Sequence, residues 1–410
     1  MTILKSNKII VLQQHYFPEM AGVARRTKEL SEEFTRKGHS VTVVTTFPRN
    51  FRSIPGYKTK KKEIINGVKV IRLKSIFEVR KNVIFRMLSY LSYVYSAFFY
   101  IMNNNNKYDF CISIAPLPPG IVGALSQKLF KLPHHFDVPD ILPDLGISSG
   151  MIKNKYIIKF LYKIESFVYN NSKSISAVTY GQVENINKKG VDRSKIKYIP
   201  DWIDFKFFVE NIKANNTNIQ EKIKNKYGNK KIISFIGNIG ALQNPIIFLR
   251  MMEKFSTINE NIILLFIGDG IMLPSLKKEV KRIGLTNVDF VGRLPRELIP
   301  SYMNLSDALI ANYLSNRYMD ICIPGKLYEY LISKTPIVMG ARGEAANFIY
   351  KHNAGIVVPP SDVNAFIKAV NDIIDKNFDY KPNYDEFIEN YSLTKITKSY
   401  ESVFKKLLKN

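Results

Sequence analysis

The stretch IPGKLYEYLISKTPIVMGARGEAANFI, residues 323–349, predicts a helix, a buried strand and a second helix in direct succession. The first helix is expected to begin at Lys326, directly after a Pro-Gly pair, and the apolar run at 335–340 is typical of a strand inside a sheet. Gly343 and Glu344 begin the next helical pattern. An apolar strand with a helix on either side is the repeating unit of a parallel sheet covered by helices.

The same alternation of short apolar runs and longer amphipathic segments extends along the 410 residues. It predicts an α/β fold with two doubly wound, Rossmann-like domains that face each other across a cleft. Ligands bind in such folds at the carboxyl ends of the strands, at the topological switch points. Strands are expected at 8–14, 39–47, 68–74, 108–115, 134–138, 174–179 and 196–200, and then at 231–238, 262–270, 288–292, 308–313, 335–340 and 354–359.

The length of the chain exceeds that of one ordinary hydrophobic core, so two domains are expected. The stretch 209–231 is rich in Asn and Lys and has few large apolar residues, which places the domain boundary there. The domains are therefore predicted at 1–208 and 209–390. The terminal segment 391–410 predicts an amphipathic helix that packs back toward the first domain.

The composition is that of a folded protein from a reducing compartment. Apolar residues make up 46% of the chain and aromatic residues 12%, enough for a real core in each half. The two cysteines, Cys111 and Cys322, are far apart in apolar segments, so no disulfide framework is expected and a cytoplasmic location is favoured. The first apolar run is interpreted as a strand, and no secretory signal is expected.

The positive charge is concentrated in the first half. Residues 1–200 contain 32 Lys and Arg against 13 Asp and Glu, whereas residues 201–410 contain 28 against 22. The densest region, 52–86, has 11 basic residues and two acidic ones. Such a region attracts nucleic acid, anionic lipid or phosphorylated substrates, although a merely solvated basic surface is an alternative.

An uncharged apolar segment, Met87 to Met102, follows this basic region directly. Its 16 residues fall short of the roughly 20 that a membrane-spanning helix needs. Its Tyr and Phe content suits a membrane interface, and a core helix under the sheet is the alternative. Both hold if one end of the helix is exposed beside the basic region.

Glycines stand at several strand-to-helix junctions, where backbone amides can approach a phosphate. Gly22 opens a helix whose first turn carries Arg25 and Arg26, and cations are unfavourable there unless an anion is present. A plain loop glycine is the alternative for Gly22. In the second half, Gly237, Gly240, Gly268 and Gly270 lie at two such junctions, and Gly292 and Arg293 form a turn after a third strand. Neither the dinucleotide fingerprint nor a Walker A loop is present, which disfavours a dehydrogenase or an ATPase.

The series FIGNIG, LLFIGDG, VDFVGRLPRELIPSYMNLSDALI, PGKLYEYLISKTPIVMGARGEAANFI and NAGIVVPPSD resembles the donor-binding half of glycosyltransferase family 4, the retaining enzymes of GT-B fold. In the first half, QQHYFPEMAGVARRTKELSEEFTRKGHSVTVVTTFP, HHFDVPDILPDLG and YIPDWID resemble the O-antigen and capsule branch, which includes N-acetyl-L-fucosamine transferases. The likeness covers nearly the whole chain, and its specificity lies in the order of the motifs.

The resemblance implies that residues 1–208 bind the acceptor and residues 209–390 bind a nucleotide sugar. Glu329 matches the second Glu of the family's Glu-x7-Glu motif, which holds the ribose hydroxyls, and Lys326 could reach the diphosphate as a point charge. Glu344 resembles the family's Glu at a helix start, where it also suits the helix dipole. The implied binding residues are Gly22, Gly237, Asn238, Gly240, Gly268, Gly292, Arg293, Lys326, Leu327 and Glu329, and the implied catalytic residues are Asp140, Lys326 and Glu344.

Two departures concern the donor half. The first Glu of the motif falls on Ile321, and the adjacent Asp320 is expected to point elsewhere. The family's usual Arg and Lys of the diphosphate loop fall on Asn238 and Gln243, so loop amides, Lys326, Arg293 or Arg317 must meet the diphosphate charge.

A third departure concerns the acceptor half. The branch's Arg-Asp-Leu-Trp-Pro is replaced by PDILP, in which Asp140 matches the Asp while Pro139 and Leu142 replace Arg and Trp. Asp140 is therefore the first-domain candidate for contact with the acceptor or the reacting sugar. His134 and His135 are expected to be strand residues rather than a catalytic base.

The expected function is a retaining, metal-independent transfer of a UDP-linked N-acetylated hexose or deoxyhexose to a polyprenyl-diphosphate-linked glycan. The sequence contains no Asp-x-Asp pair to hold a divalent metal. The region 52–86 would hold the enzyme at the anionic cytoplasmic face of the membrane. A nucleotide-sugar 2-epimerase is an alternative, as is a nucleic-acid-binding protein, given the net charge of +25. No nucleic-acid partner is expected, because basic and aromatic residues do not interleave as such binding requires.

Overall fold

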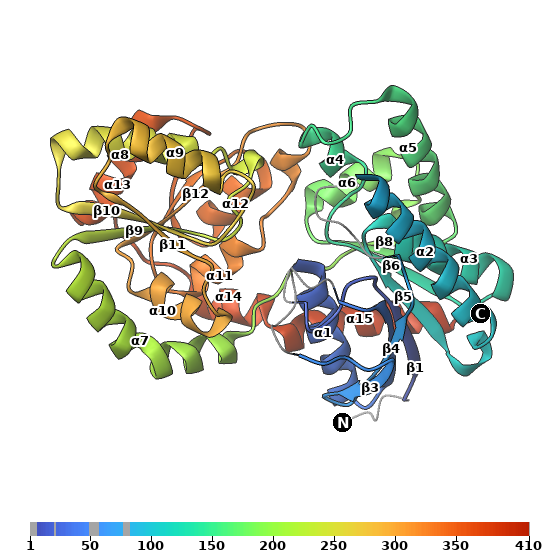
Figure 1. Cartoon of the computed structure of the whole chain (residues 1–410). Coiled ribbons are helices and arrows are strands. Elements are labelled where there is room, and N and C mark those ends of the chain that lie inside the picture. The colour runs from blue at the N-terminus through green and yellow to red at the C-terminus, as the bar shows by residue number, and fades with distance from the viewer. Residues whose placement is uncertain (1–5, 20–21, 49–56, 77–82, 410) are drawn as a thin grey trace. The chain divides into compact units, whose positions relative to one another are not determined.

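The computed structural model describes residues 6–19, 22–48, 57–76 and 83–409 and divides the chain into two compact units (Figure 1). The first unit comprises Met1–Pro200 and Leu393–Asn410, and the second comprises Asp201–Ser392. Parts of the basic region 52–86, namely 52–56 and 77–82, lie outside the described residues. The expected α/β class with two parallel-sheet domains is confirmed, and each unit is described by itself.

The boundary between the units lies at Asp201 rather than at the expected residue 209. The stretch interpreted as a polar linker is most of helix α7 (Phe205–Tyr227), which belongs to the second unit. Asp204 caps this helix by accepting a hydrogen bond from the Phe207 amide at 3.0 Å, and the helix buries Phe208 and Ile219. A few well-spaced apolar residues are therefore enough to anchor a helix whose composition is otherwise that of a linker.

The first unit contains an eight-stranded sheet in the order β3-β4-β2-β1-β5-β6-β7-β8, parallel except for β3. Its strands are β1 (Lys8–Leu12), β2 (Ser40–Thr46), β3 (Lys62–Ile65), β4 (Val68–Leu73), β5 (Phe110–Ile114), β6 (His134–Val138), β7 (Ser174–Ala177) and β8 (Ile196–Tyr198). Its helices are α1 (Gly22–Arg36), α2 (Val83–Met102), α3 (Leu117–Phe130), α4 (Asp144–Ser148), α5 (Lys155–Asn170), α6 (Tyr180–Lys188) and α15 (Leu393–Leu408), with 3-10 turns at Asn105–Lys107 and Arg193–Lys195.

Strand β3 is an element that the sequence analysis missed. It pairs antiparallel with β4 through a tight turn at Asn66 and Gly67, both of which have positive φ. An Asn-Gly pair between two segments of alternating apolar residues is the strongest short-range signal for a hairpin, and the sequence contains this pair between β3 and β4. Ile64 is 76% exposed, so β3 is an edge strand without the apolar run that marks the buried strands.

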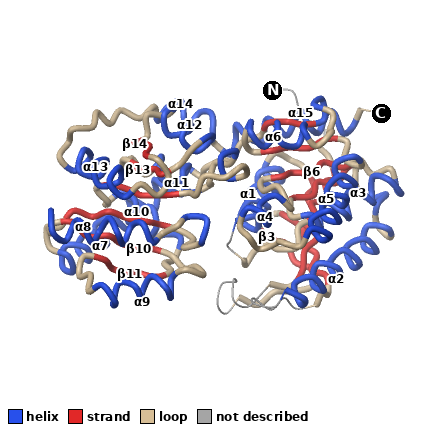
Figure 2. The backbone as a smooth tube through the Cα atoms, turned by 90° about the horizontal axis from the view of Figure 1, so that it is seen from above, coloured by secondary structure: helices blue, strands red, loops and turns tan. Residues whose placement is uncertain are grey.

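The two faces of this sheet are covered by different helices. Helices α2, α3 and α5 lie side by side in one layer, with α3 in contact with both others (Figure 2). Helix α15 packs against α1, with Phe404 beside Phe34 and Phe110. Cys111 packs in the cluster with α2, and since successive strand residues point to opposite faces, α15 covers the face opposite α2.

The second unit contains a six-stranded parallel sheet in the order β11-β10-β9-β12-β13-β14. Its strands are β9 (Lys231–Ile236), β10 (Ile262–Ile267), β11 (Val288–Gly292), β12 (Ala308–Asn312), β13 (Ile337–Gly340) and β14 (Gly355–Val358). Besides α7, its helices are α8 (Ile246–Ile258), α9 (Leu273–Ile283), α10 (Ile299–Asn304), α11 (Lys326–Ile332), α12 (Gly343–Lys351), α13 (Val363–Ile374) and α14 (Tyr384–Tyr391), with 3-10 turns η3 (Ala241–Gln243), η4 (Arg296–Leu298) and η5 (Met319–Ile321). The chain order places the topological switch point between β9 and β12.

Helix α2 packs in the core on one side, as one interpretation of its apolar segment expected, and its role as a membrane interface stays a prediction. Tyr93, Ala97 and Ile101 are fully buried against the sheet, whereas Leu91 and Tyr95 are 64% and 67% exposed. Across the part of the chain that the structure describes, none of the helices combines the length and the apolar content needed to cross a bilayer.

Buried histidines make the fold sensitive to acid. His352 lies among the rings of Phe348, Phe387 and Tyr391, and neither of its ring nitrogens has a hydrogen-bond partner. Burial lowers the pKa of His352 from 6.5 to about 4, with Lys351 as a smaller cause in the same direction. His135, on β6, is also buried, and burial lowers its pKa to about 4.

We predict that His352→Phe reduces the loss of stability below pH 6.5. The folded protein binds the proton more weakly than the unfolded chain does, so stability is complete above the unfolded pKa of 6.5 and falls as the pH drops toward 4. Each pH unit in that window lowers the folding equilibrium constant by up to about tenfold per histidine. Chemical denaturation of both proteins from pH 8 to pH 4 measures the effect, and parallel pH profiles would contradict it.

Candidate functional site

The site begins where β9 and β12 separate. The pairing of β12 with β9 covers only Ile233 and Ser234 in the middle of β9. Beyond it, the amide of Ile236 donates to the hydroxyl of Tyr330 at 2.8 Å, and that hydroxyl donates to the Ile236 carbonyl at 2.9 Å. One side chain from α11 thus takes the place of a neighbouring strand. The sheet is split at its carboxyl edge without a loss of backbone hydrogen bonds.

Lys326 stands one helical turn before Tyr330 and carries a buried amino group. Its Nζ lies 4.2 Å from the centroid of the Phe235 ring and has no hydrogen-bond partner. A Cβ placed on Gly237 would lie 3.2 Å from this nitrogen, so the amine is against the first loop of the sheet edge. A buried ammonium without a partner is unfavourable, and an anion at this position would relieve the cost.

The surroundings of Lys326 alter its protonation. Burial lowers the pKa of the ammonium from 10.5 to about 7, and the carboxylate of Glu329 opposes this shift. Glu329 lies one turn further along α11 and is partly buried. The amine is therefore poised between its charged and neutral forms near neutral pH.

Three glycine turns are stacked at this edge of the sheet, and the first of them, at Gly237, lies beside the amine. The amide of Gly237 donates to the Ile267 carbonyl at 2.8 Å, and the amide of Gly268 donates to the Gly292 carbonyl at 2.8 Å. Gly268 has φ of +139°, and a Cβ there would collide with the carbonyl oxygen of Gly237. The close approach of the turns after β9, β10 and β11 is thus possible only with glycine at Gly268.

Asn238 and Gln243, which replace the family's usual cations, have different roles. Gln243 is buried, and its Oε1 accepts a hydrogen bond from the Gly240 amide at 3.1 Å while its Nε2 donates to the Tyr313 hydroxyl at 3.4 Å. Gln243 therefore stabilises the conformation of the loop through these hydrogen bonds and does not take over the role of a cation that binds a diphosphate. Asn238 is exposed at the same loop.

A shallow hollow adjoins the start of α12, and the sequence analysis did not foresee it. A Cβ on Gly343, which has φ of +62°, would collide with the Asp320 carbonyl, so α12 begins directly against η5. Asp320 accepts a hydrogen bond from the Ser315 hydroxyl at 2.9 Å. The hollow is lined by Tyr313, Leu314, Met319, Asp320, Cys322, Pro324, Ala341, Arg342 and Ala345.

The remaining donor-site candidates are distributed around this edge. Arg293 follows Gly292 after β11 and is exposed, and Arg317 is exposed in the loop before η5. Glu344 lies in the first turn of α12 and is partly buried. Leu327 is fully buried and its amide donates to the Pro324 carbonyl at 2.9 Å, so its side chain contributes core packing and not ligand contact.

In the first unit, Asp140 is exposed just after β6, at the carboxyl edge of that sheet. Gly22 begins α1 with φ of +40°, and a Cβ there would meet open space. Asp140 and Gly22 belong to the first unit, whereas the other candidates belong to the second.

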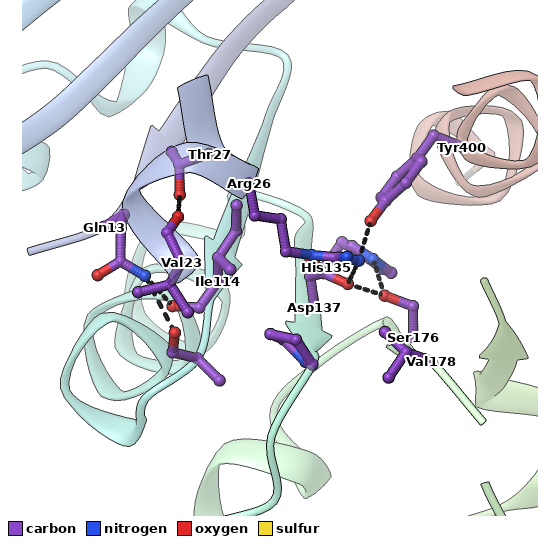
Figure 3. Close-up of polar contacts among 12 residues, drawn as sticks. Gln13, Val23, Arg26, Thr27, Ile114, His135, Asp137, Ser176, Val178 and Tyr400 are labelled. Atoms are coloured by element: carbon purple, nitrogen blue, oxygen red, sulfur yellow. Dashed lines mark hydrogen bonds and ion pairs between the residues drawn. The ribbon is translucent and has the colours of Figure 1, made fainter. Parts of the chain in front are cut away.

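The cations at the start of α1 have internal partners, contrary to the expectation of an external anion. Arg26 is buried and binds Asp137 on β6 through two hydrogen bonds, from Nε at 2.8 Å and from Nη2 at 3.1 Å (Figure 3). The Ser176 hydroxyl donates to the same carboxylate, and Arg26 keeps the pKa of Asp137 below its ordinary value despite burial. Arg25 lies 4.0 Å from Glu29. This correction removes Arg26 from the residues available to a phosphate.

The two strand histidines are core residues. His134 Nε2 is 2.6 Å from the Ser113 hydroxyl and its Nδ1 is 3.1 Å from the Ser172 hydroxyl, and burial lowers its pKa to about 3. His135 Nε2 is 3.0 Å from the Ser176 hydroxyl. Their burial and partners agree with the expectation that they are strand residues rather than a base.

The described residues contain no group of three or more His, Cys, Asp or Glu side chains that could hold a metal ion. The expectation of a metal-independent reaction stays a prediction.

Each half of the chain matches a known family. Residues 216–392 match the family described as Glycosyl transferases group 1, and residues 21–202 match the family described as Glycosyl transferase 4-like domain. WcaI of Escherichia coli (strain K12), named as a colanic acid biosynthesis glycosyl transferase, is 23% identical over 335 residues, which cover 79% of this chain and 81% of WcaI.

Solved structures share the fold over almost the whole length. A sucrose-phosphate synthase from Thermosynechococcus elongatus superposes with a TM-score of 0.77 at 16% identity, covering 98% of this chain and 99% of that one. HepE of Anabaena, solved in complex with UDP-glucose, gives a TM-score of 0.71 at 12% identity, with coverage of 97% and 99%. The fold of both halves is therefore that of the GT-B structures.

We predict that Gly268→Ala destabilises the second unit by at least about 3 kcal/mol, because it adds a backbone collision to a strained φ. The matched control is Gly284→Ala, where φ is +71° but a Cβ meets nothing within 4 Å, and the cost should be about 1 kcal/mol. Urea denaturation of both variants measures the difference. Equal losses would contradict the close packing of the glycine turns.

We also predict that Lys326→Met raises the melting temperature of the ligand-free protein at pH 7. Because the folded pKa of about 7 lies below the ordinary 10.5, the unfolded chain binds more protons between these values, and wild-type stability rises with pH there. The advantage of the variant should thus be largest at pH 7 and shrink toward pH 10. A thermal melt series over this range measures it, and a destabilised variant at pH 7 would refute it.

Proposed function

On the premise that this chain is a glycosyltransferase of GT-B fold, we propose that it transfers a sugar from a UDP-sugar to a lipid-linked glycan in the biosynthesis of a cell-surface polysaccharide. The observation that carries the proposal is the buried, unpartnered amine of Lys326 at the switch point of the second sheet. Ligands of doubly wound sheets bind at such points. A diphosphate supplies the anion that this amine lacks.

The glycine turns provide the second part of a diphosphate site. Gly237 brings its backbone against the Lys326 amine, and the turn at Gly268 packs on Gly237. The amides of Gly237 and Gly268 already donate to the carbonyls of Ile267 and Gly292, so these glycines give the site room rather than hydrogen-bond donors. In the proposed reaction the protonated Lys326 amine stabilises the charge that develops on the UDP leaving group as the bond between the sugar and UDP breaks.

Glu329 is proposed to bind the ribose. It stands one turn from Lys326 on α11, and its carboxylate can accept hydrogen bonds from two neighbouring hydroxyls. Glu344, on α12 beside the hollow at η5, and Asp140 in the first unit are proposed to contact the reacting sugar and the acceptor. Retention of configuration and an N-acetylated hexose or deoxyhexose donor come from the resemblance to the O-antigen and capsule branch.

The comparisons support the donor and the pathway of the proposal. HepE, which shares the fold, binds UDP-glucose in its crystal structure, and WcaI is named for colanic acid biosynthesis. We place the enzyme at the cytoplasmic face of the membrane, where a polyprenyl-diphosphate-linked acceptor would be available. The excess of basic residues in the first 200 positions supports an anionic surface as a partner.

The test is a thermal-shift screen of the purified protein against UDP, GDP, CDP and ADP without added metal. A ligand present at 100 times its dissociation constant stabilises the protein by about 2.7 kcal/mol. We predict a shift with UDP alone, which is lost in Glu329→Ala and Lys326→Met and kept in Glu389→Ala. Glu389 is an exposed carboxylate on α14 and serves as the matched control. A chain that responds to none of the nucleotides would refute the donor site.

The lowered pKa of Lys326 adds a sharper signature. Binding of a diphosphate favours the protonated amine, so UDP binding above pH 7 should take up a proton, and affinity should fall by up to about tenfold per pH unit. Titration calorimetry in two buffers of different ionisation enthalpy measures that uptake. A UDP affinity that is constant from pH 7 to pH 9 would argue against contact between Lys326 and the diphosphate.

A further inference from the structure

The outer side of α5 carries an apolar surface that nothing in the first unit covers. Tyr156 is 85% exposed, Phe160 62% and Ile157 49%, and Met151, just before the helix, is 66% exposed. Single exposed apolar residues are common, but four large ones within ten positions form a contiguous surface. We call the apolar residues Met151, Tyr156, Ile157 and Phe160, together with Lys153, Lys155, Lys159 and Lys163, the α5 surface.

A row of lysines runs beside these apolar side chains. Lys155, Lys159 and Lys163 are exposed and spaced four residues apart, so they form one stripe along the helix. At 100° per residue this stripe lies next to the side of the helix that carries Tyr156 and Phe160. Among the residues that the structure describes, no carboxylate forms an ion pair with Lys153 or with the lysines of the stripe.

The nearest acidic residues in the sequence do not neutralise this stripe. Between Asp144 and Glu165 the sequence contains no Asp or Glu. Glu165 is buried on the inner side of α5 and binds Lys189 at 2.8 Å, and Asp144 binds the same lysine at 3.0 Å. Both carboxylates are therefore held by an internal cation, and the outer side of α5 presents a positive field.

The α5 surface is held rigidly. The side chain of Asn154 caps the helix by accepting from the amides of Tyr156 and Ile157 at 2.9 and 3.2 Å. The inner side buries Val168 and Tyr169, and the helix packs on α3. The exposure of Tyr156 and Phe160 is thus built into the fold and is not the result of a frayed helix end.

We propose that the α5 surface binds an anionic lipid bilayer. Aromatic and aliphatic side chains would enter the boundary between headgroups and acyl chains, while the lysine stripe would contact anionic headgroups. Helix α2, in the same layer of helices as α5, also has exposed apolar residues in Leu91 and Tyr95 (Figure 2). This inference deepens the proposed function, since a lipid-linked acceptor requires an enzyme at the membrane.

Charge distinguishes the bilayer from the other occupants of such a surface. A second copy of the chain, docked by two-fold symmetry, would bring two unneutralised lysine stripes close together, which is unfavourable. A nucleic acid would pair with the lysines but would leave Met151 and Ile157 in water. An anionic bilayer satisfies the charges and the apolar side chains together.

The first experiment places a reporter on the surface. Both native cysteines are free and buried, so Phe160→Cys can be labelled selectively with an environment-sensitive dye. We expect a blue shift of the dye with vesicles of equal parts phosphatidylcholine and phosphatidylglycerol, and none with pure phosphatidylcholine. The matched control is Tyr350→Cys on α12 of the second unit, 63% exposed in the wild type, whose dye should not shift. Equal shifts at both positions, or none, would overturn the proposal.

The second experiment separates the effect of the α5 lysines on vesicle binding from the effect of the net charge of the chain. Lys155→Gln/Lys159→Gln/Lys163→Gln should lower the vesicle partition coefficient on the order of 100-fold. Lys213→Gln/Lys222→Gln/Lys224→Gln removes the same charge from exposed positions on α7 and should lower it far less. Equal losses would mean that net charge alone drives binding, and would overturn the assignment to α5.

A third measurement addresses a second copy as the occupant. Tyr156→Ser/Phe160→Ser should weaken vesicle binding at least about tenfold, as expected for the loss of two inserted aromatic side chains. A wild-type dimer that this variant dissociates, without any vesicle binding, would identify a second copy and overturn the proposal. The UDP thermal shift of the α5 variants should stay unchanged. Vesicle binding without a UDP response would instead refute the proposed function and leave the α5 surface standing.

Discussion

The hydroxyl of Tyr330 is the interaction on which the second unit depends. By bonding both backbone groups of Ile236, it lets β12 leave β9 before the carboxyl edge of the sheet without an unsatisfied peptide group. The helix that supplies Tyr330 also carries Lys326 and Glu329, so the split strands and the candidate site share one element. Any shift of α11 along the sheet would disturb the backbone bonds and the position of the lysine together.

The polar groups at the topological switch point of the first unit differ from those of the second. At the first unit's switch point between β1 and β5, the side-chain amide of Gln13 donates to the carbonyls of Ile114 and Ala115 at 2.9 and 3.0 Å (Figure 3). The buried Arg26 beside it is matched by Asp137. The side chains of Gln13 and Arg26 are thus hydrogen-bonded within the first unit, whereas the Lys326 amine in the second unit has no hydrogen-bond partner.

The large positive charge of the chain thus has at least three distinct roles. Arg26 is a structural cation, because burial makes its ion pair with Asp137 indispensable once formed. Lys326 is a cation held partly deprotonated by burial, and an incoming anion would restore its charge. The lysines of the α5 surface are solvated and unneutralised, which suits a diffuse anionic partner. Net charge alone distinguishes none of these roles.

The sequence by itself determined the class of the fold, because buried parallel strands require apolar runs and each of the runs proposed at the outset is a strand. It also located the glycine turns, since few residues other than glycine allow such close approach of the backbone. Lys326 was found from the order of the motifs, which is specific. The tertiary structure alone decided which polar groups are used internally. Arg26 binds Asp137, 111 residues away, and Gln243 binds Tyr313, 70 residues away, besides the Gly240 amide of its own loop. The two distant partners cannot be found from local sequence patterns. The tertiary structure also decided that residues 205–227 form helix α7, since its few apolar residues stabilise a helix only when they pack against the second unit.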